Sequence, residues 1–354
     1  MRHTTPTLAA ALAYVSRVNA HGHVANIVVN GESWEGYDPT TFIYFHPPPT
    51  VIGWTYDGED NGFIASSEFS HPDIICHRSA TPGGGHAVVA AGSEISLQWE
   101  EPWPRSHHGP VLDYLANCHG PCEEVDKTQL EFFKIDGAGY SPSSGTNGWA
   151  SDTLIANHDT WLVRIPADLA PGDYVLRHEI IALHEAPIHG EAQAYPQCLN
   201  LRITGSGSLR PEGIPATELY TPDDEGIHFD IYDPFSTYPI PGPPLVPGAV
   251  ESVAQRSLVA TATRTAETGY AAPAAATTTA PELPTRKMIA PEPTTLVPTK
   301  LKPTTPQPTT PETIVVVPWF PAAGKEPSAA RRRSSPLGAA ISASLGLGLL
   351  QLMA

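Results

Sequence analysis

Residues 94–99 read EISLQW, a stretch in which polar and apolar residues alternate. Alternation with a period of two is typical of a β-strand that buries one face, because successive side chains point to opposite sides. Four more runs predict strands through their β-branched and aromatic residues: QLEFFKI (129–135), TWLVRIP (160–166), YVLRHEIIAL (174–183) and QCLNLRIT (197–204). We therefore expect a core made of strands.

Clusters of turn-forming residues separate these runs, for example PGGG (82–85), SPSSGTNG (141–148) and APGDY (170–174). Short strands at this spacing, with no long helical period, predict an all-β protein. The expected fold is an antiparallel, immunoglobulin/fibronectin-like β-sandwich whose long loops carry the function. Residues 21–247, about 225 in number, are a reasonable size for one such domain.

The first 20 residues have the pattern of a secretory signal peptide. Arg2 gives a basic start, the apolar run LAAALAYV (8–15) follows, and VNA (18–20) has small residues where signal peptidase cuts. The apolar run is far shorter than the roughly 20 residues of a membrane-spanning helix. The alternative is an N-terminus without a targeting role. Cleavage after Ala20 would leave His21 with a free α-amine.

The C-terminal third of the chain has a different composition. Residues 248–321 are Ala, Thr and Pro repeats, which predict a disordered, extended stalk because they cannot bury enough apolar surface to offset the cost of ordering. Residues 322–354 combine small residues, a polar spacer with RRR and an apolar tail, the order of a glycosylphosphatidylinositol (GPI) anchor signal. A membrane-spanning helix and an unstructured end are the alternatives. We expect a secreted protein that is held at the cell surface.

The charge balance restricts the class of partner. The chain has 20 Lys and Arg against 37 Asp and Glu, a formal net charge of −17. This balance argues against nucleic acid or an anionic surface as partner, because both would repel the chain. A neutral polymer is compatible with it.

Four cysteines in an exported chain predict two disulfides. Four cysteines allow three pairings, and the sequence alone does not separate them. The close pair in CHGPC (Cys118 and Cys122) suggests a local bond, which would leave Cys76 with Cys198. A zinc site is the less favoured alternative, since no second close pair accompanies the first.

The chain contains fifteen histidines, several of them in suggestive positions. His107 and His108 are adjacent in SHHGP, and His178 and His184 lie in RHEIIALHEA. The helical metalloprotease motif is excluded, because its two histidines are four residues apart and these are six apart in a strand-like run. Strand alternation would put His178 and His184 on one face, where both could contribute to one side of a site.

An N-terminal histidine favours one metal over the others that imidazole can bind. The α-amine of His21, its ring nitrogen and a second imidazole make a planar set of three nitrogens, which tetragonal Cu(II) accepts. Zinc would prefer a tetrahedron. The sequence therefore predicts a copper site if His21 is the first residue.

Several longer motifs resemble one family, the auxiliary activity family 9 lytic polysaccharide monooxygenases, formerly called glycoside hydrolase family 61. The resemblance covers about residues 21–246. It rests on HGHV (21–24), PDIICHR (72–78), PWPRSHHGPV (102–111), KTQLEFFKI (127–135), YVLRHEIIALHEA (174–186), YPQC (195–198) and YPIPGPP (238–244). It implies a secreted copper-dependent β-sandwich that oxidatively cleaves β-1,4-glucans such as cellulose.

Carried over residue by residue, the resemblance implies a site for one copper ion. His21 and His107 would hold the ion as a histidine brace, and Tyr195 would be the axial residue. His184 and Gln193 would hydrogen-bond oxygen species beside the metal, the usual role of groups just outside the ligands. His108 is expected to be structural or to position its neighbour.

The resemblance also implies the disulfides Cys76 with Cys198 and Cys118 with Cys122. It points to Tyr44 in TTFIYFHPPP and Tyr238 in STYPIPGPP as aromatic residues on a flat polysaccharide-binding surface. No cysteine follows Cys198, so we expect no small disulfide-bonded cellulose-binding module.

The reaction implied is oxidation at C1 and/or C4 of the glucan, with O2 or H2O2 as co-substrate. A small-molecule reductant or an enzyme like cellobiose dehydrogenase would be the electron donor, and the protein is expected to be a monomer. No spacing marks two carboxylates as a glycosidase pair. Two alternatives remain: the same chemistry on xyloglucan or another cell-wall glucan, and a non-catalytic cell-surface copper-binding protein.

Overall fold

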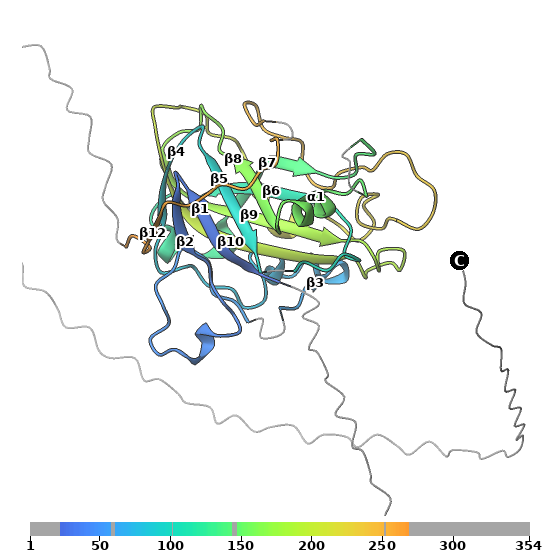
Figure 1. The fold of residues 1–354 in the computed structure, drawn as a ribbon, viewed down its shortest axis with the longest axis horizontal. Helices are drawn as coiled ribbons and strands as arrows, with labels where there is room; N and C mark the ends of the chain where they lie inside the picture. Colours follow the sequence, from blue (N-terminus) through green and yellow to red (C-terminus); the bar gives the residue numbers. More distant parts are fainter. Residues whose placement is uncertain (1–21, 58–60, 101, 144–146, 251–252, 269–354) are drawn as a thin grey trace, which may run out of the picture. The chain divides into compact units, whose positions relative to one another are not determined.

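The computed structural model describes residues 22–57, 61–100, 102–143, 147–250 and 253–268 (Figure 1). The expected signal peptide (1–20), most of the expected stalk and the expected anchor signal (322–354) lie outside these ranges, as does His21. Within these ranges, no helix has the length and hydrophobicity needed to cross a membrane.

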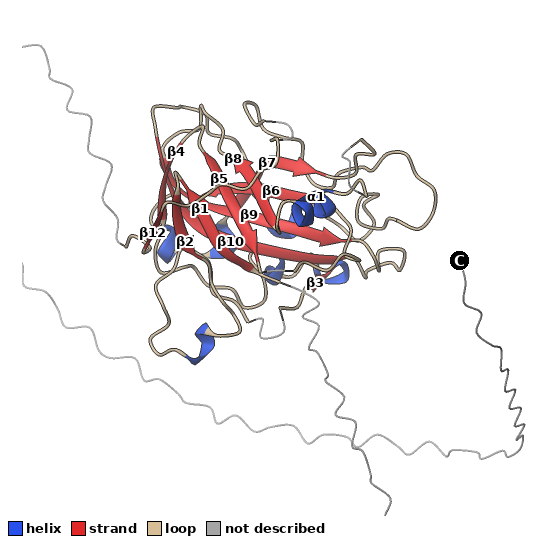
Figure 2. Ribbon diagram, viewed as in Figure 1, coloured by secondary structure: helices blue, strands red, loops and turns tan. Residues whose placement is uncertain are grey.

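Two β-sheets make the sandwich (Figures 1 and 2). The first has the order β12 (Ala262–Arg264), β2 (Glu32–Glu35), β1 (Val24–Val29), β5 (Glu94–Trp99) and β8 (Thr160–Arg164). The second has the order β11 (Ile214–Pro215), β7 (Glu131–Ala138), β6 (Val111–Asn117), β9 (Gly172–Ala182), β10 (Gln193–Thr204) and β3 (Ile64–Ala65), with β4 (Ala87–Ala90) also on β10. All pairs are antiparallel except β12 with β2 and β4 with β10.

Helical segments are short and lie in the connections, as Figure 2 shows. The α-helix α1 spans Ala150–Ala156, and the 3₁₀ segments are η1 (Phe42–Tyr44), η2 (Ser66–Glu68), η3 (Pro72–Ile74), η4 (Cys122–Glu124), η5 (Lys127–Gln129) and η6 (Ala216–Glu218). The predicted all-β sandwich is confirmed, and each of the five predicted strands corresponds to an observed one.

Local sequence explains the hairpin between β1 and β2. Its two-residue turn is Asn30–Gly31, and both residues have positive φ, 53° and 77°. Such a turn matches the right-handed twist of the flanking strands, and Asn-Gly is a favoured pair for it.

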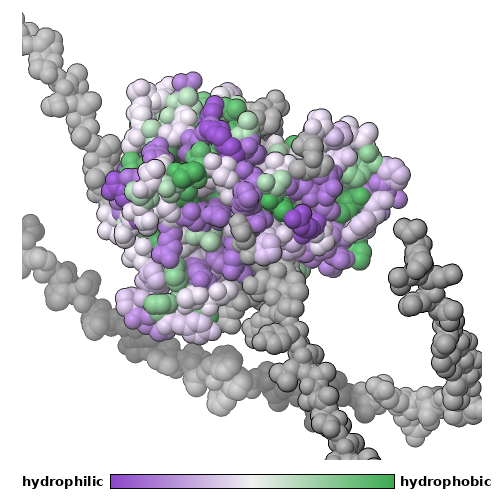
Figure 3. Space-filling view, viewed as in Figure 1, coloured by the Kyte–Doolittle hydropathy of each residue, from purple (hydrophilic) through white to green (hydrophobic). Residues whose placement is uncertain are grey.

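The second sheet is buried on both faces. On β6, Val111 and Leu115 pack between the sheets, whereas Leu112 and Tyr114 pack under the long loops that cover the outer face. Strands buried on both sides are almost continuously apolar, which explains why the β9 and β10 sequences do not alternate clearly. Figure 3 shows a mainly polar surface with small, separate apolar patches on the face viewed.

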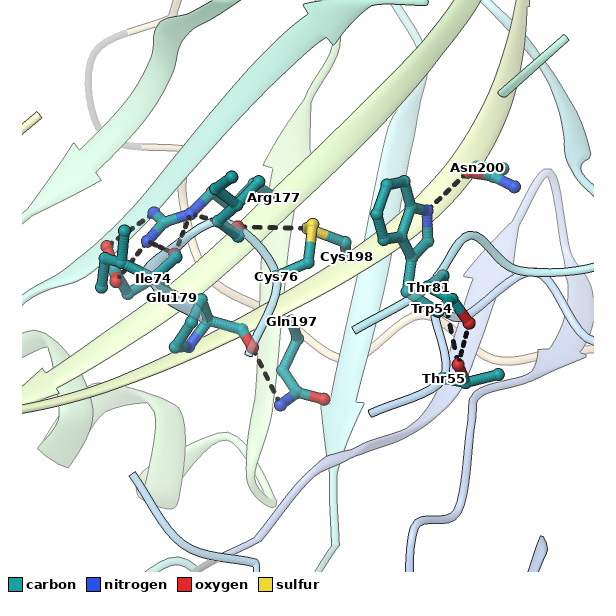
Figure 4. The surroundings of a disulfide bond; sticks show 12 residues. Trp54, Thr55, Ile74, Cys76, Thr81, Arg177, Glu179, Gln197, Cys198 and Asn200 are labelled. Atoms are coloured by element: carbon teal, nitrogen blue, oxygen red, sulfur yellow. Dashed lines mark hydrogen bonds and ion pairs between the residues drawn. A yellow bond between two sulfur atoms is a disulfide. The ribbon is translucent and has the colours of Figure 1, made fainter. Parts of the chain in front are cut away.

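Both predicted disulfides are present, Cys76–Cys198 and Cys118–Cys122. The first connects the loop after η3 to β10 (Figure 4). Beside it, the buried Arg177 donates to the carbonyl oxygens of Ile74 and Ile75 and forms an ion pair of 2.6 Å with Glu179. The loop is thereby fixed to the second sheet by a covalent bond and by charge-assisted hydrogen bonds.

A segment of the expected stalk is packed on the domain. Residues 253–268, which we call the strap, run along the first sheet and contribute β12. The Gln255 side chain accepts from the backbone of Leu162 at 2.7 Å and donates to it at 3.0 Å. Near the end of the strap, the backbones of His86 and Glu267 bond to each other in both directions. Ordered packing therefore extends past residue 247, the expected domain boundary.

Candidate metal centre

Three side chains named from the sequence meet at one end of the sandwich. His107 lies in the loop after β5, His184 follows the end of β9, and Tyr195 is in β10. The rings of His107 and His184 are stacked, with centroids 4.0 Å apart and an interplanar angle of 27°. The centroids of His107 and Tyr195 are 6.4 Å apart. Strand pairing thus brings together residues that are far apart in the sequence.

The Tyr195 phenol is fully buried and has a fixed direction. Its hydroxyl donates to Oε1 of Gln193 at 2.8 Å. The two residues are two positions apart on one strand, so they share a face. Trp103 packs edge-on against Tyr195 at 5.0 Å and against His107 at 5.9 Å. This indole holds both rings in place.

The orientation of His107 is set by its neighbours. Its Nδ1 lies 3.1 Å from the Ser106 hydroxyl, and its backbone N–H donates to the carbonyl of Pro104 at 2.9 Å. Because Nδ1 is engaged, a metal bond from this ring would use Nε2.

His184 is half-buried, and its surroundings favour the neutral form of its imidazole. Burial lowers the pKa of its imidazole, and the nearby His108 lowers it further against the opposing effect of Glu185. Its Nδ1 is buried and has no hydrogen-bond partner among the described residues. The other ring nitrogen, Nε2, is not among the buried atoms without a partner.

The N-terminal arm, residues 22–24, is attached to both sheets. The carbonyl of His23 accepts from the backbone of Glu100, the residue after β5, at 2.8 Å. The Val24 N–H donates to Oε1 of Gln197 in β10 at 3.4 Å. The arm is thus fixed between the strand that leads to His107 and the strand that contains Tyr195.

Among the residues that the structure describes, no group of three or more His, Cys, Asp or Glu side chains could hold a metal ion. The predicted copper site requires only one such side chain from this part of the chain, His107, because its other protein donors belong to His21. The buried imidazole, the adjacent phenol and the fixed N-terminal arm are a donor arrangement that fits copper.

The other histidines have different surroundings from those expected. β9 ends at Ala182, so strand alternation does not reach His184. His178 lies in the sandwich interior, where its Nε2 accepts from Trp99 Nε1 and its Nδ1 donates to Asp113, both at 2.8 Å. The shared face expected for His178 and His184 was therefore wrong. The ring of His108 contacts Asp152 of α1, which agrees with a structural role.

The two aromatic residues expected on a substrate surface differ in how much of their side chains is exposed. Tyr44 is 74 % exposed, whereas Tyr238 is only 9 % exposed. The Tyr238 hydroxyl donates to the Gly226 carbonyl, and its ring packs on Trp149. The expectation for Tyr238 was therefore wrong, because packing against the neighbouring loops covers its ring.

The sequence reading missed Tyr232, six residues before Tyr238. Its ring is 70 % exposed, and its hydroxyl donates to the backbone carbonyl of His184 at 3.0 Å. The segment DIYDP (230–234), in which an aromatic residue stands among acidic ones, could have indicated an exposed aromatic side chain. A hydrogen bond thus connects the exposed Tyr232 to the backbone of the candidate metal centre.

Comparisons with known proteins agree with the architecture. Residues 21–238 match the model of Auxiliary Activity family 9 (formerly GH61). AA9 family lytic polysaccharide monooxygenase H of Thermothelomyces thermophilus is 58 % identical over 259 residues, which are 73 % of this chain and 75 % of that protein. Lytic polysaccharide monooxygenase A of Podospora anserina is 56 % identical over 266 residues, 75 % of each chain. The extended catalytic domain of LPMO9A from H. jecorina matches with a TM-score of 0.68 and 54 % identity, covering 70 % of this chain and all of that one.

Proposed function

The chain belongs to Auxiliary Activity family 9, the lytic polysaccharide monooxygenases, and from this premise we propose that it cleaves cellulose by copper-dependent oxidation at C1 and/or C4. The observation that carries the proposal is the stack of His107 on His184 beside the buried Tyr195. A protein that only stored copper would not need His184 and Gln193 around its metal ligands.

In this proposal, one copper ion is held by the amine and ring of His21 and by Nε2 of His107. Copper, when bound, supplies the one-electron redox chemistry by which a reductant and O2 or H2O2 oxidise a C–H bond of the glycosidic linkage. The buried Tyr195 phenol would lie beside the ion and would shield it from water. The engagement of Ser106 with Nδ1 of His107 supports this assignment, because it leaves the metal to the other ring nitrogen.

Gln193 and His184 are proposed to bind the oxygen co-substrate. Oε1 of Gln193 already accepts from Tyr195, so the amide nitrogen is the end that can donate to a small oxygen molecule. The imidazole of His184 would hold or donate a proton at the side of the ring that faces this molecule. Groups of this kind orient and tune a metal site from just outside its ligands.

The proposed substrate is a neutral β-1,4-glucan. The exposed rings of Tyr44 and Tyr232 offer planes on which sugar rings can lie, and a chain with a net charge of −17 disfavours an anionic polymer. One similar solved structure, with 31 % identity and a TM-score of 0.54, is titled a cellulose-active polysaccharide monooxygenase from M. thermophila. The electron donor would be a small-molecule reductant or a dehydrogenase of the cellobiose-oxidising kind, and the protein would act as a monomer.

Export and attachment belong to the same proposal. A signal peptide at residues 1–20 would expose the amine of His21, and the GPI signal at 322–354 would retain the enzyme at the cell surface. Both segments lie outside the described residues.

Product analysis tests the proposal. The mature, copper-loaded protein is incubated with a reductant and cellulose, and soluble products are analysed by mass spectrometry for aldonic and 4-keto oligosaccharides. Oxidised products that vanish in His107→Ala and persist in His119→Ala, an exposed histidine, are the expected result. Oxidised products from xyloglucan alone would show that the substrate is a glucan other than cellulose. The absence of products from every glucan would favour a non-catalytic copper-binding protein.

A further inference from the structure

The first three residues of the proposed mature chain are His21, Gly22 and His23. A free amine followed by histidine at the third position is a strong Cu(II) chelate in its own right. When Cu(II) displaces the protons of the two following peptide N–H groups to solvent, the amine, these two peptide nitrogens and Nδ1 of the third residue's imidazole form one plane around the ion, the tetragonal geometry that Cu(II) prefers. This chelate would use the same amine as the histidine brace, so the two sites compete for copper.

The competing chelate needs Nδ1 of His23, and in the folded protein this atom already has two partners. Nδ1 of His23 lies 3.2 Å from Oδ1 of Asn61 and 3.3 Å from Oε2 of Glu100. Asn61 in turn donates to Glu100 at 3.2 Å. The His23 residue is only 3 % exposed. Its ring is therefore held inside the protein by two partners that also hold each other.

The backbone of the arm is fixed as well. A square-planar chelate would have to turn both peptide nitrogens toward one ion. The His23 carbonyl is bonded to the Glu100 backbone, and a Cβ placed on Gly22 would lie 3.2 Å from the Glu100 carbonyl oxygen. The arm lies too close to Glu100 for the chain to wrap around an ion without leaving its place.

We propose that the cluster of His23, Asn61 and Glu100 selects the copper geometry by withholding Nδ1 of His23. Copper that reaches the amine of residue 21 is then directed to the histidine brace. His23 is thus a positioning residue rather than a ligand. This inference rests on the proposed function, since it requires residue 21 to begin the chain and copper to be the metal.

Spectroscopy of the mature, full-length protein tests the inference with Cu(II) as the probe. Asn61→Ala with Glu100→Ala removes both side chains that hold Nδ1 of His23 and so releases its ring, and we expect part of the copper to move to the four-nitrogen site. That site gives a visible absorption band at shorter wavelength than the brace and an EPR spectrum with coupling to four nitrogens. Adding His23→Phe to the releasing changes should remove the new signal. Glu191→Ala, an exposed carboxylate change, should leave the wild-type spectrum unaltered.

A urea titration tests the same competition without the substitutions at Asn61 and Glu100. The wild type should change from the brace spectrum to the four-nitrogen spectrum along its unfolding transition, and His23→Phe should lose copper without that change. A folded releasing variant with the wild-type spectrum, or unfolded wild type without the four-nitrogen spectrum, overturns the inference and leaves the proposed function standing. Folded wild type with no brace spectrum overturns both.

Discussion

Asp136 is a buried carboxyl group whose ionisation should control the stability of the domain. It lies between the sheets, directly opposite Asp113 in the register of β6 and β7. Trp161 donates to one of its oxygens at 3.1 Å. Burial, followed by the negative charge of Asp113, raises the pKa of Asp136 to about 7. One oxygen of each Asp has no hydrogen-bond partner among the described residues.

The sign and size of the effect follow from linkage. An unfolded Asp keeps its ordinary pKa of 3.8, so the folded protein holds one proton more than the unfolded chain between about pH 4 and pH 7. The contribution of Asp136 to the free energy of unfolding should be highest below this window and fall as pH rises, by about 1.4 kcal/mol per pH unit. The total loss across the window is roughly 4 kcal/mol.

Asp136→Asn removes this loss, because an amide of the same shape does not ionise. Relative to wild type, the variant should be stabilised by roughly 4 kcal/mol more at pH 8 than at pH 4. Urea unfolding of the metal-free mature protein, followed by tryptophan fluorescence at a series of pH values, measures the difference. Asp168→Asn, an exposed carboxyl change, should give no pH-dependent difference. A stability difference between Asp136→Asn and wild type that stays constant from pH 4 to pH 8 would refute the reasoning.

Three further predictions concern the covalent link, the surface and the site. Replacing both Cys76 and Cys198 by Ser should lower the free energy of unfolding by about 5 kcal/mol in the chain-entropy model, since the bond closes a loop with a sequence separation of 122; urea unfolding measures it. Tyr232→Ala should weaken cellulose binding by roughly 1 kcal/mol, about fivefold, in a pull-down assay, and Tyr232→Phe should bind like wild type; equal binding by both would exclude the ring from the surface. His184→Ala should slow oxidised-product formation by roughly 10- to 100-fold, with a far smaller change in copper affinity by calorimetry; an unchanged rate would contradict its role.

Local patterns in the sequence were sufficient to predict much of the fold. The alternation in EISLQW predicted β5 to the residue, because its apolar side chains Ile95, Leu97 and Trp99 all pack in the core on one face. The close spacing of Cys118 and Cys122 suggested the bond between them, the family resemblance implied it, and the structure contains it. The longer motifs named His107 and Tyr195, and the structure brings these two residues together.

Only tertiary structure decided which side chains are exposed and which nitrogens are engaged. Tyr232 and Tyr238 stand in the same loop with similar neighbours, yet packing on Trp149 buries the second and leaves the first outside. The strap has the composition of a stalk, but the edge of the first sheet gives it backbone partners at β2. Burial and hydrogen bonding depend on residues that are distant in the chain, and no local periodicity carries that information.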